Sequence, residues 1–166
     1  VTAGGATRAV AAGTISFVPP GASSIRATSN GRLVRIFTSR SADLAAQCSN
    51  AADFAKPSPN VAPIVDWPVP VGGYQLRTYS LDVPREPGRF GRIWRGSALM
   101  VNVLYPDKAR DPKALSPHHH DDFEQCSLAL DGEYVHHLRW PWITDMTQWR
   151  PDDHEPRGGA GGDPRH

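Results

Sequence analysis

Residues 117–132 read PHHHDDFEQCSLALDG and place three histidines, several carboxylates and a cysteine directly ahead of a strand-like apolar run. His118, His120 and Glu124 are separated by even offsets of two and four residues. Side chains at even offsets in an extended chain point to one face. Two imidazoles and a carboxylate on one face can hold a divalent metal ion and leave coordination positions open for water or substrate. This stretch therefore predicts a metal site with the ligands His118, His120 and Glu124.

The residues that follow, from Ser127 to Trp142, form the most strand-like stretch of the chain, SLALDGEYVHHLRWPW. Asp131-Gly132 inside it predicts either a two-residue hairpin turn or a bend in one long strand. In the hairpin, His137 shares the face of Glu124, whereas in a continuous strand His136 takes that face. The sequence leaves open which of the two histidines approaches the metal.

The composition excludes several classes of protein. The chain has 166 residues and a net charge of +1 from 18 basic and 17 acidic residues, which argues against a general nucleic-acid or membrane surface. No apolar run approaches the roughly 18 residues that span a bilayer, and the first residues lack the apolar core of a secretory signal. Two cysteines form no disulfide framework, so a reducing cytoplasm is expected.

The 16 prolines and 15 glycines favour an all-β protein with tight turns. We expect the first dozen residues to be loosely held and a helix to run from Ser41 to about Phe54, with Cys48 packed in the core. Arginines 85, 89, 92 and 95 can receive an anionic ligand or form a solvated loop. Strands are expected at residues 15–18, 33–37, 74–83 and 98–106, with the first two joined by a turn at Asn30-Gly31 and the last buried on both faces.

The pattern His118-x-His120-xxx-Glu124, followed by Gly132, resembles the first motif of the cupin superfamily. The spacing to Gly132 is one residue longer than usual, and the leading glycine of the motif is missing. Upstream, Gly13, Pro19 and Gly21 resemble the opening of the second cupin motif, with SFVPPG in its familiar form. The histidine expected after Gly21 is replaced by Ser24. The two motifs also occur in reverse order.

This resemblance implies a cupin-type jelly-roll β-barrel with one short helix, in an incomplete two-cupin arrangement. Residues 1–55 would be the end of a first, degenerate cupin unit, 56–73 a Pro-rich linker, 74–150 the metal-site cupin unit and 151–166 a disordered tail. The fourth ligand of the family, the histidine of the second motif, has no match after Arg150. The chain is then either a fragment or a protein whose tail has diverged. A single barrel closed in permuted order is the other reading.

The resemblance also implies function. A cupin with His118, His120 and Glu124 as ligands is expected to bind Fe, Mn, Zn or Ni and to act as a dioxygenase or isomerase on a small organic or sugar-derived substrate. The incomplete ligand set equally favours a non-enzymatic cupin module that binds a small ligand, or an inactive truncated cupin. Cupins often associate through barrel edges, so a homodimer is expected. No nucleic-acid or membrane partner is expected.

Overall fold

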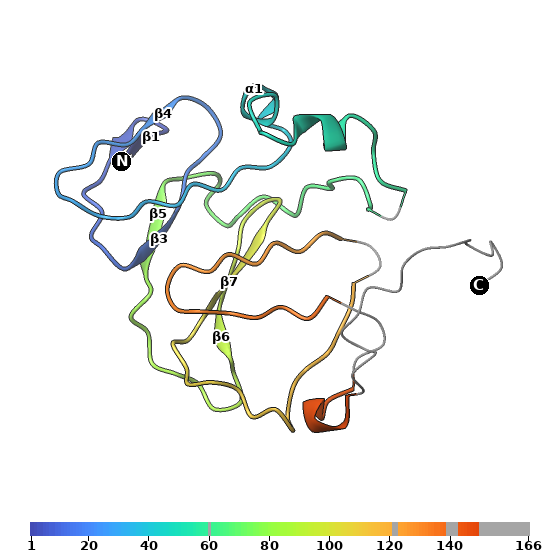
Figure 1. The fold of residues 1–166 in the computed structure, drawn as a ribbon. Coiled ribbons are helices and arrows are strands. Elements are labelled where there is room, and N and C mark those ends of the chain that lie inside the picture. The colour runs from blue at the N-terminus through green and yellow to red at the C-terminus, as the bar shows by residue number, and fades with distance from the viewer. Residues whose placement is uncertain (60, 121–122, 139–142, 150–166) are drawn as a thin grey trace. The chain divides into compact units, whose positions relative to one another are not determined.

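The computed structural model describes residues 1–59, 61–120, 123–138 and 143–149. Within these residues, short strands prevail over helix: seven strands of two to five residues accompany one four-residue α-helix and two 3₁₀ helices (Figure 1). The expectation of a β-rich chain with one short α-helix is confirmed. The chain divides into two compact units, Val1–Pro106 and Asp107–His166.

In the first unit, β3 (Thr14–Phe17) pairs antiparallel with β5 (Arg77–Ser80), so that Thr14 lies opposite Ser80 (Figure 1). The hydroxyls of Ser16 and Thr78 are hydrogen-bonded across the pair at 2.9 Å. In the sequence, β3 precedes the Pro-rich segment 56–73 and β5 follows it. The pairing of these strands therefore places both, together with this segment, in one compact unit. The division into two cupin units stays a prediction.

The longest strands of the chain's described part are β6 (Gly91–Arg95) and β7 (Met100–Leu104), which pair antiparallel with Gly91 opposite Leu104. The guanidinium of Arg92 donates hydrogen bonds to the carbonyls of Leu81, Val103 and Leu104. One half-buried side chain thus ties β7 to the end of β5. Gly91 is buried, and a Cβ at this position would lie 3.1 Å from the carbonyl oxygen of Val103 and 3.2 Å from the Cα of Leu104.

The third sheet contains β1 (Thr2–Ala3), β2 (Ala6–Thr7) and β4 (Ser23–Ser24) in the order β2-β1-β4. Gly4 and Gly5, at φ of +56° and +76°, form the turn between β1 and β2, which positive φ angles at both central residues favour. Ala3 is 2% exposed. The expectation of a loosely held N-terminus is wrong, because these residues pair on both sides.

Two sequence-based expectations for residues 25–55 are also wrong. Residues 33–37 form no strand, and β3 pairs with β5 and not across an Asn30-Gly31 turn. The helix is broken into α1 (Ala42–Ala45) and the 3₁₀ helix η1 (Ala51–Phe54). Cys48 is exposed, and its thiol donates to the carbonyl of Leu44 at 3.6 Å; neither α1 nor η1 contains a buried residue, so the predicted apolar stripe is not covered.

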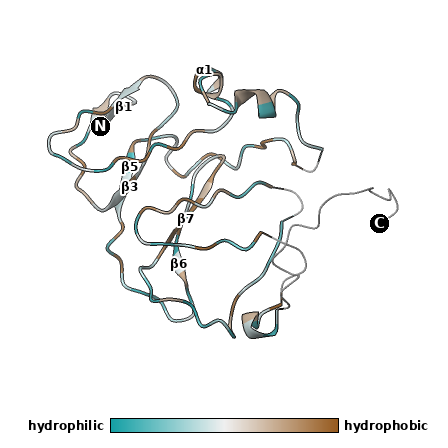
Figure 2. Ribbon diagram, viewed as in Figure 1, coloured by the Kyte–Doolittle hydropathy of each residue, from teal (hydrophilic) through white to brown (hydrophobic). Residues whose placement is uncertain are grey.

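The described residues bury few apolar side chains. Among them, the buried hydrophobic residues are Ala3 and Leu76, whereas Met100 and Leu104 of β7 are 60% and 45% exposed. The expectation that residues 98–106 are buried on both faces is therefore wrong. Figure 2 shows that β7 is rich in hydrophobic residues. No helix in the described part of the chain has the length and apolar character to cross a membrane.

The second unit contains the 3₁₀ helix η2 (Met146–Gln148), and its described residues include no strand. The prediction of a strand after Ser127 is thus wrong for residues 127–138. Residues 139–142 lie outside the described residues. The amide of Leu115 donates to the carbonyl of Thr144 at 3.0 Å, and that of Met146 donates to the carbonyl of Pro112 at 2.7 Å. These bonds fix the segment that leads to the histidines. The predicted tail, residues 151–166, lies outside the described residues.

Candidate metal site

His118 and His120 lie three and five residues after Leu115, whose amide is held by Thr144. Their rings face each other edge to face, with centroids 5.2 Å apart and planes at 72°. His120 also lies against Phe123, with ring centroids 4.1 Å apart. Two imidazoles at an offset of two residues thus lie close together.

The tautomer of His118 follows from its hydrogen bond. Nδ1 of His118 lies 2.9 Å from the carbonyl oxygen of Ser116, which can only accept a proton. Nδ1 therefore donates, and in the neutral ring Nε2 keeps its lone pair. A metal-ligating histidine commonly donates its other ring N–H to a carbonyl in this way. The arrangement fits a ring whose Nε2 is presented to a cation.

The remaining predicted ligand, Glu124, is not gathered with the two rings. No group of three His, Cys, Asp or Glu side chains stands ready to hold a metal ion among residues 1–59, 61–120, 123–138 and 143–149. Asp121 and Asp122 lie outside the described residues. The structure thus brings two of the three predicted ligands together, and both Glu124 as a ligand and the metal ion itself stay predictions.

The chain reverses at Asp131-Gly132, where Gly132 has φ +83°. The two runs on either side of this turn lie side by side (orange in Figure 1), and Oγ of Ser127 lies 2.9 Å from Nε2 of His136. Ser127 lies three residues before Leu130, and His136 lies three after Glu133. A two-residue turn at Asp131-Gly132 gives this same pairing. The structure therefore takes the hairpin alternative of the two that the sequence left open.

Several residues fix the environment of His137. Its ring lies edge-on to Trp149, with centroids 5.0 Å apart. The indole nitrogen of Trp149 donates to the carbonyl of Ile143 at 3.0 Å. Trp149 directly follows η2, whose N-cap is Asp145.

Hydrogen bonds from the Thr147 hydroxyl and then from the Gln148 amide lower the pKa of Asp145, and the backbone amide of Thr147 acts in the same direction.

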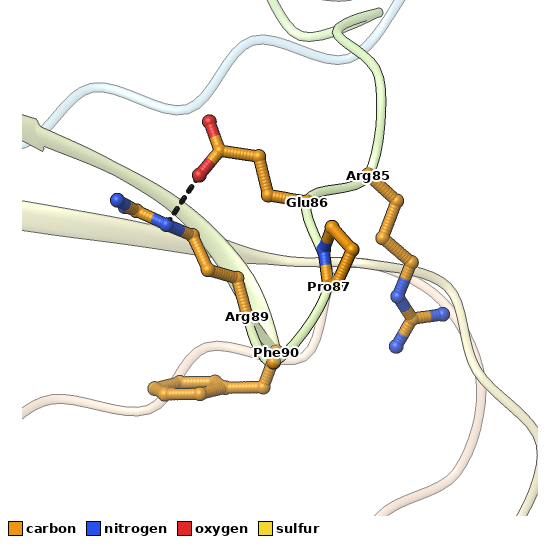
Figure 3. Close-up of a pocket in the computed structure, with 6 residues that line it drawn as sticks. Arg85, Glu86, Pro87, Arg89 and Phe90 are labelled. Carbon is orange, nitrogen blue, oxygen red and sulfur yellow. Dashed lines mark ion pairs between the residues drawn. The ribbon is translucent and has the colours of Figure 1, made fainter.

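The basic loop of the first unit forms a shallow open hollow of about 500 Å³ (Figure 3). Nε of Arg89 lies 2.6 Å from Oε2 of Glu86, and Arg85 points away from this ion pair. The guanidinium of Arg85 lies over the Tyr105 ring at 5.0 Å, and Arg95 lies over Trp67 at 3.8 Å. These arginines have partners inside the protein, which favours the solvated-loop interpretation over an anion site. The hollow is lined by Arg85, Glu86, Pro87, Gly88, Arg89 and Phe90.

Ser24, the residue in place of the second-motif histidine, lies exposed in β4 opposite Thr2. A serine hydroxyl cannot replace an imidazole as a ligand of comparable strength. Sequence reasoning did not single out Ser127, although counting outward from the Asp-Gly turn places it opposite His136. No sequence pattern predicted that the Arg92 side chain donates hydrogen bonds to three backbone carbonyls.

The comparisons with known proteins return no matching family model, no matching curated protein and no matching solved structure.

Proposed function

We propose that the protein binds one divalent transition-metal ion through His118, His120 and Glu124, within a cupin-type jelly-roll fold. The observation that carries this proposal is the His118–His120 pair. At metal–nitrogen distances of about 2.0–2.1 Å and tetrahedral angles, two imidazoles on one ion have centroids roughly 5 Å apart. The observed separation of 5.2 Å matches this geometry, and the bond from His118 to Ser116 orients one ring.

The donors restrict the choice of ion. Imidazole nitrogens with one carboxylate suit Fe(II), Mn(II), Zn(II) and Ni(II) better than the oxygen-seeking Ca²⁺ and Mg²⁺. Such an ion supplies Lewis acidity toward a small organic or sugar-derived substrate, or the redox chemistry of a dioxygenase. The described residues around the histidines are exposed, which leaves room for a small molecule to reach them. The short antiparallel strands support a cupin-type barrel, and the free, exposed thiols of Cys48 and Cys126 support a reducing cytoplasmic setting.

A non-enzymatic role is the second candidate, favoured by Ser24 in the position of the fourth ligand. A cupin module of this kind binds a small ligand without turning it over. Binding that survives a chelator, with no product formed, identifies the module. Binding or turnover that is lost with the metal identifies the enzyme. A homodimer through exposed strand edges is compatible with either role.

The test measures metal content and thermal stability of the full chain. We expect about one equivalent of metal after loading with Fe(II), Mn(II), Zn(II) or Ni(II), and a higher melting temperature, because a ligand at 100 times its Kd stabilises the folded state by about 2.7 kcal/mol. His118→Ala and His120→Ala should lose the metal. His119→Ala, which removes the intervening histidine, is the matched control and should keep it. Wild-type protein that takes up none of the four ions, with no change in melting temperature, contradicts the proposal.

A further inference from the structure

The segment from Leu33 to Phe37 has the sequence of a strand but belongs to no sheet. Its residues, LVRIF, are rich in β-branched and other apolar side chains that favour extended chain. The guanidinium of Arg35 lies 4.9 Å from the centroid of the Phe37 ring. Side chains two residues apart lie on one face of an extended chain, so this contact indicates that the segment is extended.

The backbone of this segment is open to a partner. Among the residues that the structure describes, no backbone–backbone hydrogen bond involves residues 33–37. The side chains of both faces are exposed as well, with Leu33 at 63% and Ile36 at 56%. A row of unpaired amides and carbonyls is a template to which another extended chain can add a strand.

The stretch around the segment is held on both sides. Before it, β4 pairs with β1, with Ser23 opposite Ala3. After it, Arg40 donates hydrogen bonds to the carboxylate of Asp66 at 2.5 Å and to the carbonyl of Ile64 at 3.2 Å. Figure 1 shows the chain between β4 and α1 without an arrow or a coil. Because its ends are fixed, the segment loses less conformational freedom when a second strand binds.

Charge indicates the kind of partner. Residues 1–42 contain five arginines and no aspartate or glutamate, although the net charge of the whole chain is +1. Arg40 is paired with Asp66 inside the protein, whereas Arg35 is exposed within the open segment. A carboxylate directly opposite Arg35 on an added strand forms a favourable cross-strand pair. The five arginines are Arg8, Arg26, Arg32, Arg35 and Arg40.

Other occupants fit the segment less well. Antiparallel pairing of two copies centred on Arg35 places two arginines directly opposite each other, and like charges at such positions destabilise a strand pair. Single-stranded nucleic acid is bound by aromatic rings on which bases stack, and the ring of Phe37 already carries the Arg35 guanidinium. A peptide that alternates acidic and apolar residues matches both the charge of Arg35 and its apolar neighbours.

We propose that residues 33–37 are a docking strand for an extended acidic peptide of a partner protein. The peptide adds to the docking strand through backbone hydrogen bonds and places a carboxylate opposite Arg35. The docking strand belongs to the first unit, whereas the proposed metal ligands belong to the second, so the two proposals are independent.

The test measures binding of two labelled heptapeptides to the full chain by fluorescence anisotropy. One peptide alternates glutamate and valine, and the other has lysine in place of glutamate. We expect the lysine peptide to bind at least about tenfold more weakly, because favourable cross-strand pairs become unfavourable ones. Arg35→Glu should lower the affinity for the glutamate peptide about tenfold for the same reason. Arg8→Glu, the matched control, changes the net charge equally outside the docking strand and should alter the affinity less than about threefold, because salt screens distant charges.

A second readout separates strand addition from attraction by charge alone. Neighbouring residues of a strand direct their amides to opposite edges, so one of Ile36→Pro and Phe37→Pro removes a donor whichever edge is used. That variant should bind the glutamate peptide about fivefold more weakly than the variant with alanine at the same position. Bound peptide should also slow the proton exchange of amides 33–37. Circular dichroism checks that each variant is folded.

Three results would overturn the inference. The first is folded wild-type protein that does not bind the glutamate peptide or binds both peptides equally. The second is an equal loss of affinity in Arg8→Glu and Arg35→Glu, which indicates attraction by charge alone. The third is tighter binding of a short oligothymidylate or of anionic phospholipid vesicles than of the glutamate peptide, which identifies another class of partner. None of these results bears on the metal site.

Discussion

Two chain reversals in this protein look alike in sequence and differ in structure. The reversal between Gly91 and Leu104 has five residues on each side in a complete ladder, β6 and β7. The reversal between residues 123 and 138 has the stronger strand pattern, yet its described residues contain no strand. Across it, a side-chain hydrogen bond joins Ser127 and His136. Leu138 and Val135 within it are 92% and 80% exposed.

The difference shows that a turn sets the register of a hairpin but does not by itself form the ladder. In the first reversal, Arg92 binds carbonyls on both neighbouring segments, and Gly91 lets the backbone of Leu104 approach closely. In the second, Gly132 supplies the turn at φ +83°, and none of residues 123–138 is buried. Segments with few buried apolar contacts open and adapt most easily, and ligand-binding loops are drawn from them. We therefore interpret the second reversal as the adaptable part and the first as the scaffold.

The largest effect is expected from Gly91→Val, which should break the first reversal. The new side chain meets the Asn102 side chain and the backbone of Val103 and Leu104, and overpacking of this kind costs roughly 3 kcal/mol. Urea unfolding measures the loss. Gly31→Ala is the control, because Gly31 has no atom within 4 Å of an added Cβ and no positive φ, and it should stay within about 0.5 kcal/mol of the wild type. Equal midpoints for the two variants would show that the close approach at Gly91 is unimportant.

Arg92→Met should destabilise the same reversal by about 2 kcal/mol, because three carbonyls lose a charged donor at a half-buried position. Arg89→Met removes only an exposed ion pair with Glu86, so its cost should stay below about 1 kcal/mol. Chemical unfolding of both variants makes the comparison. A cost for Arg89→Met equal to that of Arg92→Met argues against the anchoring role of Arg92.

Gly132→Ala should weaken the second reversal by about 1 kcal/mol, because an L-residue at φ +83° is strained. Proton-exchange rates of amides 125–138 should rise, and the NMR contact between Ser127 and His136 should disappear. An unchanged contact in this variant would mean that another feature sets the register.

The smallest effect concerns Asp145 and pH. Because hydrogen bonds from Thr147 and Gln148 lower the pKa of Asp145 in the folded chain, its cap contributes stability above the ordinary aspartate pKa of about 3.9. This contribution is lost as the pH falls through the lowered folded pKa. The NMR shifts of the Thr147 amide should report the loss, and Asp145→Asn should flatten that dependence. A midpoint at or above the ordinary value contradicts the cap.

The parts of the fold that the sequence predicted are those set by local chemistry. The strands near residues 15–18, 74–83 and 98–106 were found in shortened form, because alternation and turn residues are local signals. Their pairing was not, because β3 joins β5 over more than sixty residues and nothing at Asn30-Gly31 signals that choice. The prediction that Cys48 is buried was wrong for a similar reason, because burial depends on another element of the chain packing over the residue, which local sequence does not reveal.

The candidate site divides in the same way. The even offset of His118 and His120 predicted that they share a face, and their rings lie 5.2 Å apart, whereas their role as ligands stays a prediction. The Asp131-Gly132 turn gave two alternatives, and only the three-dimensional contact of Ser127 with His136 chose between them. Glu124 is not gathered with the two rings among the described residues, and its even offset alone did not determine where its side chain lies.

The most direct test of the metal site is an NMR titration of the full chain with Zn(II) that follows the imidazole nitrogens. We predict that at one equivalent of Zn(II) one ring nitrogen each of His118 and His120 shifts strongly, while the ring nitrogens of the intervening His119 shift much less. Imidazole spectra that do not change with excess Zn(II), in protein that remains folded, would contradict the account.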